Sequence, residues 1–135
     1  MTLPLLPTTV IGSHPLPSWL WLAREAMTSG HLGATEIREV VEDATRVAIA
    51  DQTETGVDVL GTGEMPRVRF IVGFYDHLTG IRPQDPPRKV GAPHYDSYPI
   101  LEVVDRVTAP DGLGIVDEWK LARRLTDRPL KATCP

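Results

Sequence analysis

The chain has one cysteine, no long apolar run and no excess of positive charge, and each shortage argues against a class of protein. A single cysteine, Cys134, cannot form an internal disulfide, which favours a reducing cytoplasm. No apolar run approaches the ~20 residues of a membrane-spanning helix. The N-terminus lacks a positive region followed by an apolar segment, so we expect no secretory signal. The sequence therefore predicts a cytoplasmic protein without a membrane partner.

Charge argues against nucleic acid as a partner, because the formal net charge is -4 and the sequence pI is about 5.5. The 41% hydrophobic and 24% charged content is typical of a globular protein. No HExxH or CxxC spacing occurs, and no Ser/His/Asp or Cys/His nucleophile set can be read. We therefore expect no metal ligands in this chain. Cys134, at the end of the third predicted strand, could be a thiol near a ligand site, but its expected role is that of a small buried residue.

Short runs of β-branched and apolar residues predict strands at residues 8–11, 57–60 and 130–133. Apolar periodicity predicts helices at residues 19–29, 36–55, 66–79 and 115–126. Ser18 and Thr35 are the expected N-caps of the first two helices. Prolines between residues 83 and 99 indicate a long excursion, and excursions of this length tend to be functional. Residues 100–108 are expected to be extended and to pair with residues 89–92.

This order of strands and helices predicts a parallel α/β sheet with right-handed crossovers. Such a sheet must be covered on both faces or closed into a barrel. Roughly two and a half β/α units are too few to close a barrel, so we expect an incomplete fold. Either the chain is a piece of a longer protein, or a second polypeptide completes the sheet.

Polar residues follow the first two predicted strands, at the sheet edge where parallel α/β folds bind ligands. Gly12, Ser13 and His14 follow the first strand, and Glu64 follows the second. Neighbouring strands lie ~4.8 Å apart, so Ser13 and Glu64 would face one pocket. Backbone N–H groups and the Ser13 hydroxyl suit a carboxylate, and the Glu64 carboxylate suits an ammonium. We therefore expect the pocket to bind the α-amino-acid end of a small ligand.

A purely structural interpretation of these residues stands beside the functional one. Glycine after a strand is ordinary turn chemistry, Ser13 could cap a turn, and Glu64 could sit at a helix N-terminus. Arg67 and Arg69 could meet an anionic ligand or could be solvated charges on a helix. Either polar cluster alone favours the structural interpretation, whereas two clusters at one edge leave both interpretations open.

Three segments resemble the cobalamin-independent methionine synthase family. The run "LPTTVIGSHP", residues 6–15, resembles the TT-x-x-GS-aromatic-P motif on the first strand of its catalytic barrel. The run "GVDVLGTGE", residues 56–64, resembles the second strand, which ends in GE, and "RPLKATCP", residues 128–135, resembles the approach to the third. The resemblance implies that residues 1–135 are the N-terminal part of a TIM (β/α)8 barrel.

The resemblance also implies a zinc-dependent enzyme of the 5-methyltetrahydropteroyltriglutamate–homocysteine S-methyltransferase type, which makes methionine. Zinc would lower the pKa of the homocysteine thiol, so that a thiolate can attack a methyl group. Ile11, Gly12 and Ser13 would hold the amino-acid end of homocysteine, Glu64 would bind its ammonium, and His14 would lie beside them. The family's zinc ligands lie on later strands, so we expect the 135 residues alone to be inactive.

Two departures from the family pattern leave the chemistry open. His14 stands where the family usually has Phe or Tyr, and residues 82–99 lack the Arg-Cys run that contributes to the folate site. The methyl donor could therefore be methyltetrahydrofolate or a methyl-corrinoid protein. Related alternatives are a zinc-thiolate enzyme that adds coenzyme M to epoxides, and a non-catalytic subunit of a split barrel that a second chain completes.

Overall fold

A computed structural model describes residues 3–67, 73–86, 89–90 and 98–134. The chain divides into two compact units. The first comprises residues 1–68 and 115–134, and the second is formed by residues 69–114 together with residue 135. The first unit contains every residue of the predicted pocket, so the fold of that unit positions the site.

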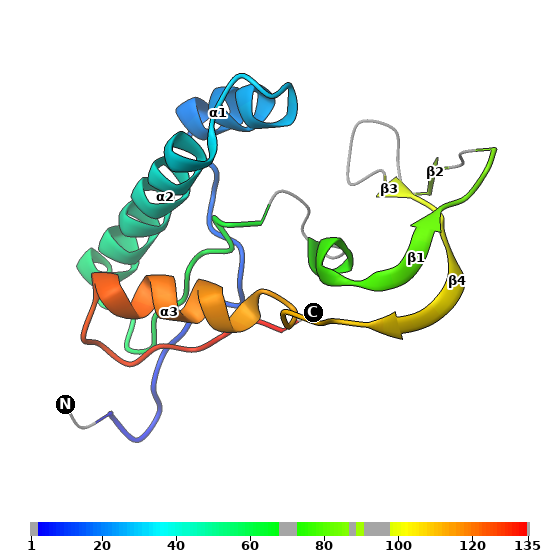
Figure 1. Cartoon of the computed structure of the whole chain (residues 1–135). Helices are drawn as coiled ribbons and strands as arrows, with labels where there is room; N and C mark the ends of the chain where they lie inside the picture. The colour runs from blue at the N-terminus through cyan, green and yellow to red at the C-terminus, as the bar shows by residue number, and fades with distance from the viewer. Residues whose placement is uncertain (1–2, 68–72, 87–88, 91–97, 135) are drawn as a thin grey trace. The chain divides into compact units, whose positions relative to one another are not determined.

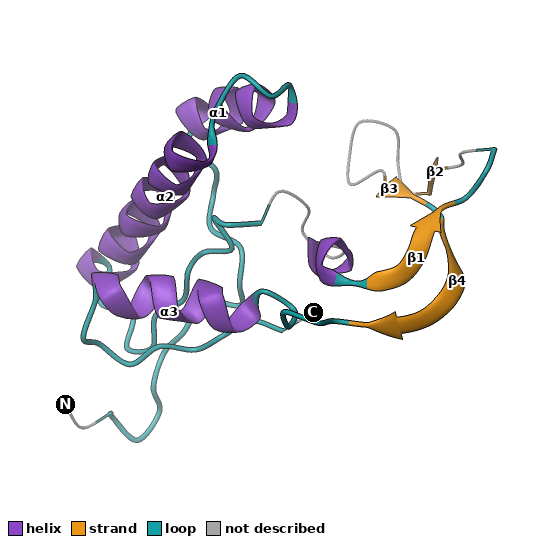
Figure 2. Ribbon diagram, viewed as in Figure 1, coloured by secondary structure: helices purple, strands orange, loops and turns teal. Residues whose placement is uncertain are grey.

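The predicted parallel pairing is present in the first unit as two isolated bridges. Thr9 bridges Val59, and Leu60 bridges Leu130, both in parallel orientation. The three extended segments are therefore ordered as they occur in the chain, with the second in the middle. Figure 2 draws them as loops because each bridge is too short to count as a strand. The predicted strands thus exist as parallel pairing partners, but as isolated bridges in place of regular strands.

Three helices cover these segments: α1 is Ser18–Thr28, α2 is Ala34–Glu54 and α3 is Ile115–Leu125. The long helix α2 packs against both of the others (Figure 1). The two predicted N-caps are wrong, because Pro17 and Gly33 occupy those positions. At α2 the Glu36 carboxylate, one turn into the helix, accepts the Gly33 N–H at 2.6 Å, which is the half of a capping box that does not need an N-cap side chain.

The core of this unit consists of two apolar clusters on either side of α2. One contains Leu20, Ala44, Ala48 and Met65, and the other contains Ile49, Leu60 and Ala122. Small residues on α2 let the helix approach the extended segments closely. Helix α2 therefore packs against the middle segment just before the residues of the predicted pocket.

The side-chain amide of Gln52, which is 2% exposed, holds the end of the middle segment. Its Nε2 donates to the Gly61 carbonyl at 3.0 Å and to the Ala48 carbonyl at 2.8 Å. The Gly61 N–H donates to Gln52 Oε1 at 3.0 Å. The amide thus pairs with Gly61 as a neighbouring strand would, and it fixes the backbone that leads to Glu64.

The second unit corrects two predictions. The helix predicted at residues 66–79 is wrong: residues 68–72 lie outside the description, Gly73–His77 is the 3-10 helix η1, and strand β1, Thr79–Pro83, follows. Glycine lowers helix stability by about 1 kcal/mol, and an available strand partner outweighs the helical spacing of Phe74 and Leu78.

The predicted extended segment is present as β4, Leu101–Thr108, but its predicted partner is wrong. Strand β4 pairs antiparallel with β1, and the Arg82–Glu102 ion pair, at 2.7 Å, lies across this pairing. Lys89–Val90, which is β2, pairs instead with β3, Tyr98–Pro99, while residues 91–92 lie outside the description. After β4 the chain turns, and the Gly112 N–H donates to the Ala109 carbonyl at 3.1 Å.

A carboxylate also ties the first two extended segments together at their other end. The Thr8 N–H and hydroxyl both donate to Asp58 Oδ2 at 2.8 Å. The backbone hydrogen bond first, and then the side-chain one, hold the pKa of Asp58 below its usual value. Because the folded pKa is depressed, the stabilisation is present above the unfolded pKa and is lost as pH falls through the folded pKa.

We expect Thr8→Val to raise the pKa of Asp58 toward the ordinary value of about 3.9 without reaching it, because the backbone bond remains. A carbon-detected NMR titration of the carboxyl group measures this shift. Thr55→Val, which removes a hydroxyl bonded only to α2 carbonyls, serves as the control and should leave the titration unchanged. An identical midpoint in Thr8→Val and the unmodified chain would contradict the assignment.

Candidate functional site

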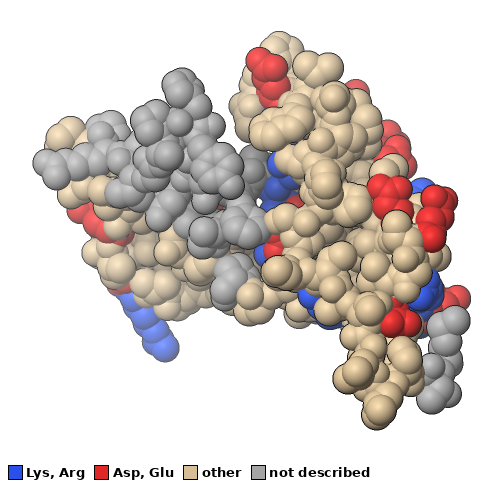
Figure 3. Space-filling view, turned by 180° about the vertical axis from the view of Figure 1, so that it is seen from behind, with Lys and Arg blue, Asp and Glu red and all other residues tan. Residues whose placement is uncertain are grey.

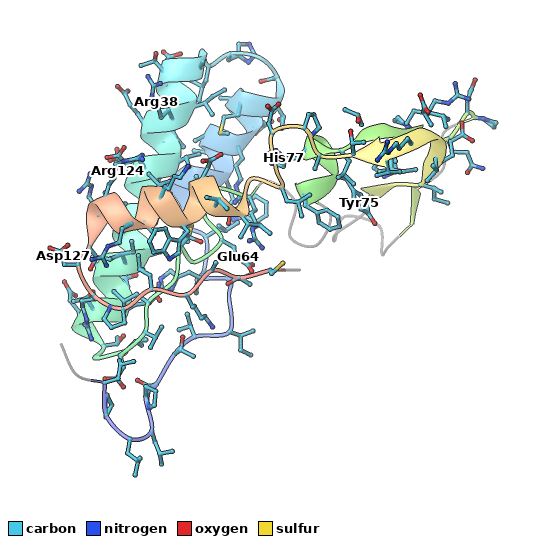
Figure 4. The ribbon with its side chains drawn as sticks, turned by 60° about the horizontal axis from the view of Figure 1, so that its bottom comes forward. Arg38, Glu64, Tyr75, His77, Arg124 and Asp127 are labelled. Carbon is cyan, nitrogen blue, oxygen red and sulfur yellow. The ribbon has the colours of Figure 1, made fainter. Side chains whose placement is uncertain are left out.

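The structure brings together Ser13 and Glu64, which sequence analysis places at one sheet edge. The Ser13 hydroxyl donates to Glu64 Oε2 across two neighbouring segments. Glu64 is only 7% exposed, and its φ of 57° lies in the left-handed region that non-glycine residues rarely adopt. Such a backbone costs roughly 1–3 kcal/mol and tends to persist at functional sites. Figure 4 labels Glu64 near α3.

Two glycines pack directly against this cluster. A Cβ on Gly12 would lie 2.5 Å from Glu64 Oε1 and 3.2 Å from a Thr133 methyl. Gly63 has a φ of 65°, and its Cβ would lie 2.7 Å from the His14 Cβ and 2.9 Å from the Ala48 Cβ. Gly63 therefore requires glycine for space and for its backbone, whereas a Cβ on Gly12 would require the Glu64 side chain to shift.

Arg67 is a member of this cluster that the sequence left open. Its side chain is 8% exposed, and it forms a forked pair with Glu118 on α3 at 2.9–3.1 Å. One further nitrogen lies 3.3 Å from Glu64 Oε1, and Nη2 also donates to the Thr133 carbonyl at 2.5 Å. The interpretation of Arg67 as a solvated helix charge is therefore wrong. The structure does not describe Arg69.

The cluster and its immediate surroundings contain charged side chains of both signs. Desolvation alone would lower the pKa of Arg67, but the hydrogen bonds and charge of Glu118, together with the charge of Glu64, raise it overall. The ion-paired set has two carboxylates and one guanidinium, and the Arg24 guanidinium and the Lys131 ammonium bind backbone carbonyls beside it. An ionised carboxylate has about four acceptor positions, and Glu64 uses two of them, for Ser13 and Arg67. Glu64 therefore has acceptor positions left for a cationic N–H group.

The end of the first segment supplies the other part of the predicted pocket. Among the described residues, the backbone N–H groups of Gly12 and Ser13 have no hydrogen-bond acceptor. Ile11 is 95% exposed, so its side chain has little contact with the described residues. Lys131, which sequence analysis missed, crosses from the third segment and donates to the Val10 and Ile11 carbonyls. No motif marks this lysine.

His14 belongs to the rim of the cluster and contacts α2. Its N–H donates to the Gly63 carbonyl at 2.9 Å, and its Nε2 lies 3.0 Å from Asp51 Oδ2. Cys134 is exposed, so the prediction of a buried cysteine is wrong. Within the described ranges no group of three or more His, Cys, Asp or Glu side chains could hold a metal ion. These residues therefore do not fit a zinc centre of their own.

Surface charge and helix composition add two observations. On the face drawn in Figure 3, the described Lys and Arg side chains are interspersed with Asp and Glu and form no basic patch. None of the helices in the described part of the chain is long and apolar enough to cross a membrane.

Comparison with known proteins identifies the family. The model of the cobalamin-independent synthase catalytic domain matches residues 6–133. The chain belongs to this family. Two relatives are named methionine synthase, from Sulfurisphaera tokodaii and Saccharolobus solfataricus. Each is 32% identical over 124 residues, which cover 92% of this chain and 36% of the relative. This cobalamin-independent synthase chain thus spans little more than a third of the length of these relatives.

Solved structures support the same fold for this cobalamin-independent synthase chain. A B12-independent methionine synthase from Shewanella sp. W3-18-1, in complex with selenomethionine, matches with a TM-score of 0.70 and 27% identity. That match covers 94% of this chain and 37% of the other. A second structure, from Listeria monocytogenes, has a TM-score of 0.61 at 20% identity and supports the fold alone. The α/β fold is therefore similar to that of B12-independent methionine synthase.

Proposed function

We propose that this chain supplies part of the amino-acid site of a methyltransferase that converts homocysteine to methionine. The observation that carries the proposal is the buried Glu64 carboxylate, which lies beside the N–H groups of Gly12 and Ser13 and has acceptor positions left beyond its bonds to Ser13 and Arg67. A zwitterionic amino acid needs an acceptor for its ammonium and donors for its carboxylate, and this edge provides both.

Glu64 would accept the ligand ammonium with its two remaining acceptor positions. The ligand carboxylate would bind the backbone N–H groups of Gly12 and Ser13. The Ser13 hydroxyl donates to Glu64, so in this arrangement it positions Glu64 and does not donate to the ligand. His14, held by Asp51, would border the pocket.

The rest of the enzyme would complete this edge. In this proposal, residues 1–135 form the N-terminal part of an incomplete TIM barrel, and a further barrel segment or a second chain adds the remaining strands. Zinc, expected in the complete enzyme, would be held by that remainder. The methyl group would come from methyltetrahydrofolate or a methyl-corrinoid protein. A cytoplasmic location agrees with the single cysteine.

The test compares L-methionine with 4-(methylthio)butanoate, which lacks only the ammonium group. We expect the chain to bind methionine more tightly than 4-(methylthio)butanoate. Glu64→Gln should weaken methionine binding by about 1–3 kcal/mol, roughly 5- to 150-fold, because a charge-assisted contact is lost. NMR-detected titration into the millimolar range measures both ligands.

Glu42→Gln is the matched control, since Glu42 pairs with Arg46 on the outer side of α2. It should leave both affinities unchanged. Equal affinity for the two ligands, or unchanged methionine affinity in Glu64→Gln, would remove Glu64 from the site and overturn the proposed function.

A further inference from the structure

Arg67 is the residue through which the cluster at the sheet edge is connected to the rest of the first unit. It contacts Glu64 in its own loop, Glu118 on α3 and the carbonyl of Thr133 at the end of the third segment. Its own carbonyl accepts a hydrogen bond from Arg24 on α1 at 2.5 Å. Groups from two helices, from the third extended segment and from its own loop therefore fix its backbone and its guanidinium.

The Glu64 carboxylate is bound by two side chains and lies close to the backbone of Gly12. Arg67 contacts Oε1, Ser13 donates to Oε2, and the space beside Oε1 is so narrow that a Cβ on Gly12 would lie 2.5 Å away. Because Ser13 is itself exposed on the first segment, Arg67 is the more rigid of the two donors.

Arg67 contacts Glu64 less closely than it contacts Glu118. Its forked contact with Glu118 is shorter than its single contact with Glu64, 2.9 Å against 3.3 Å. Lysine has a point charge and cannot form the same fork while it reaches a second carboxylate. Glu64 is thus kept beside a cation, and acceptor positions on its carboxylate remain open.

We propose that Arg67 is a positioning residue that holds the Glu64 carboxylate against Gly12 and so sets the preference of the pocket for a ligand that carries an ammonium group. The ligand part of this inference rests on the proposed function. The positioning part concerns only this chain, and it can be tested without a ligand.

The ligand-free test is a double-mutant cycle between Gly12→Ala and Arg67→Met, measured by urea-induced unfolding. If Arg67 presses the carboxylate against Gly12, the added methyl should be better tolerated once Arg67 is removed, because Glu64 can then move. We expect a coupling of about fivefold or more in the folding equilibrium constant. Arg46→Met, which removes the exposed partner of Glu42, replaces Arg67→Met in the control cycle and should be additive with Gly12→Ala.

The ligand test measures the ratio of the affinities for methionine and 4-(methylthio)butanoate. We expect Arg67→Met to reduce this ratio about tenfold and Arg67→Lys to restore part of it, whereas a merely structural role would weaken both ligands alike. The inference would be overturned if the losses of unfolding free energy from Gly12→Ala and Arg67→Met were additive. It would also be overturned if a folded Arg67→Met chain kept the same ratio of affinities for the two ligands. If the unmodified chain shows coupling but no preference for methionine, the proposed function and the ligand part fail while the positioning of Glu64 by Arg67 stands.

Discussion

Gly63→Ala is expected to destabilise the chain by about 2–5 kcal/mol, one of the two largest effects predicted for a single substitution. The left-handed φ of 65° alone costs an alanine roughly 1–2 kcal/mol. The added methyl would also overlap the Cβ atoms of His14 and Ala48, which are fixed to their backbones and cannot rotate away. Overpacking of this kind typically adds about 1–3 kcal/mol. Urea-induced unfolding, followed by tryptophan fluorescence, measures the loss.

Gly56→Ala separates the two causes. Gly56 has a φ of 79°, but a Cβ there would meet no atom within 4 Å. This control should therefore lose only the backbone term, about 1–2 kcal/mol. Equal losses of unfolding free energy in the two variants would mean that overlap of the added methyl with His14 and Ala48 does not destabilise the chain.

Gln52→Leu is the second substitution with a large expected effect, about 2–4 kcal/mol. Leucine keeps most of the buried volume but leaves the Gly61 N–H and carbonyl without the amide that now pairs with both. Each buried group left unpaired costs roughly 1–3 kcal/mol, and water cannot readily replace the amide beside α2. The same unfolding measurement applies.

Glu54→Leu is the control for Gln52→Leu, because it makes a similar change at an exposed position on the same helix. Its effect should stay within about 0.5 kcal/mol. A similarly small loss in Gln52→Leu would show that the hydrogen bonds between the Gln52 amide and Gly61 contribute little to stability.

Sequence patterns predicted the parts of the fold that depend on local spacing. The apolar period of α2 and α3 predicted both helices to within a residue or two, and β-branched runs predicted the three segments that pair in parallel. Ser13 and Glu64 were predicted to lie close together because the carboxyl ends of neighbouring parallel segments share one edge. Their binding role remains a prediction.

Other parts depend on contacts between residues far apart in the chain. A helix was predicted for residues 66–79 because residue spacing alone cannot reveal that β4 offers β1 a partner. Arg67, Lys131 and Gln52 act through long side chains on backbone or charged groups of other segments. No motif distinguishes such residues from ordinary solvated ones, so only coordinates reveal them.

The hydrogen bonds of Lys131 bear on the order in which the segments of the first unit come together. They join its ammonium to the Val10 and Ile11 carbonyls, 121 and 120 residues away. Closing a loop of this length has an entropic cost that must be met before the contact contributes any stability. The edge at Gly12 and Ser13 therefore takes its final form only when the third segment has docked against the second and Lys131 reaches across to the first.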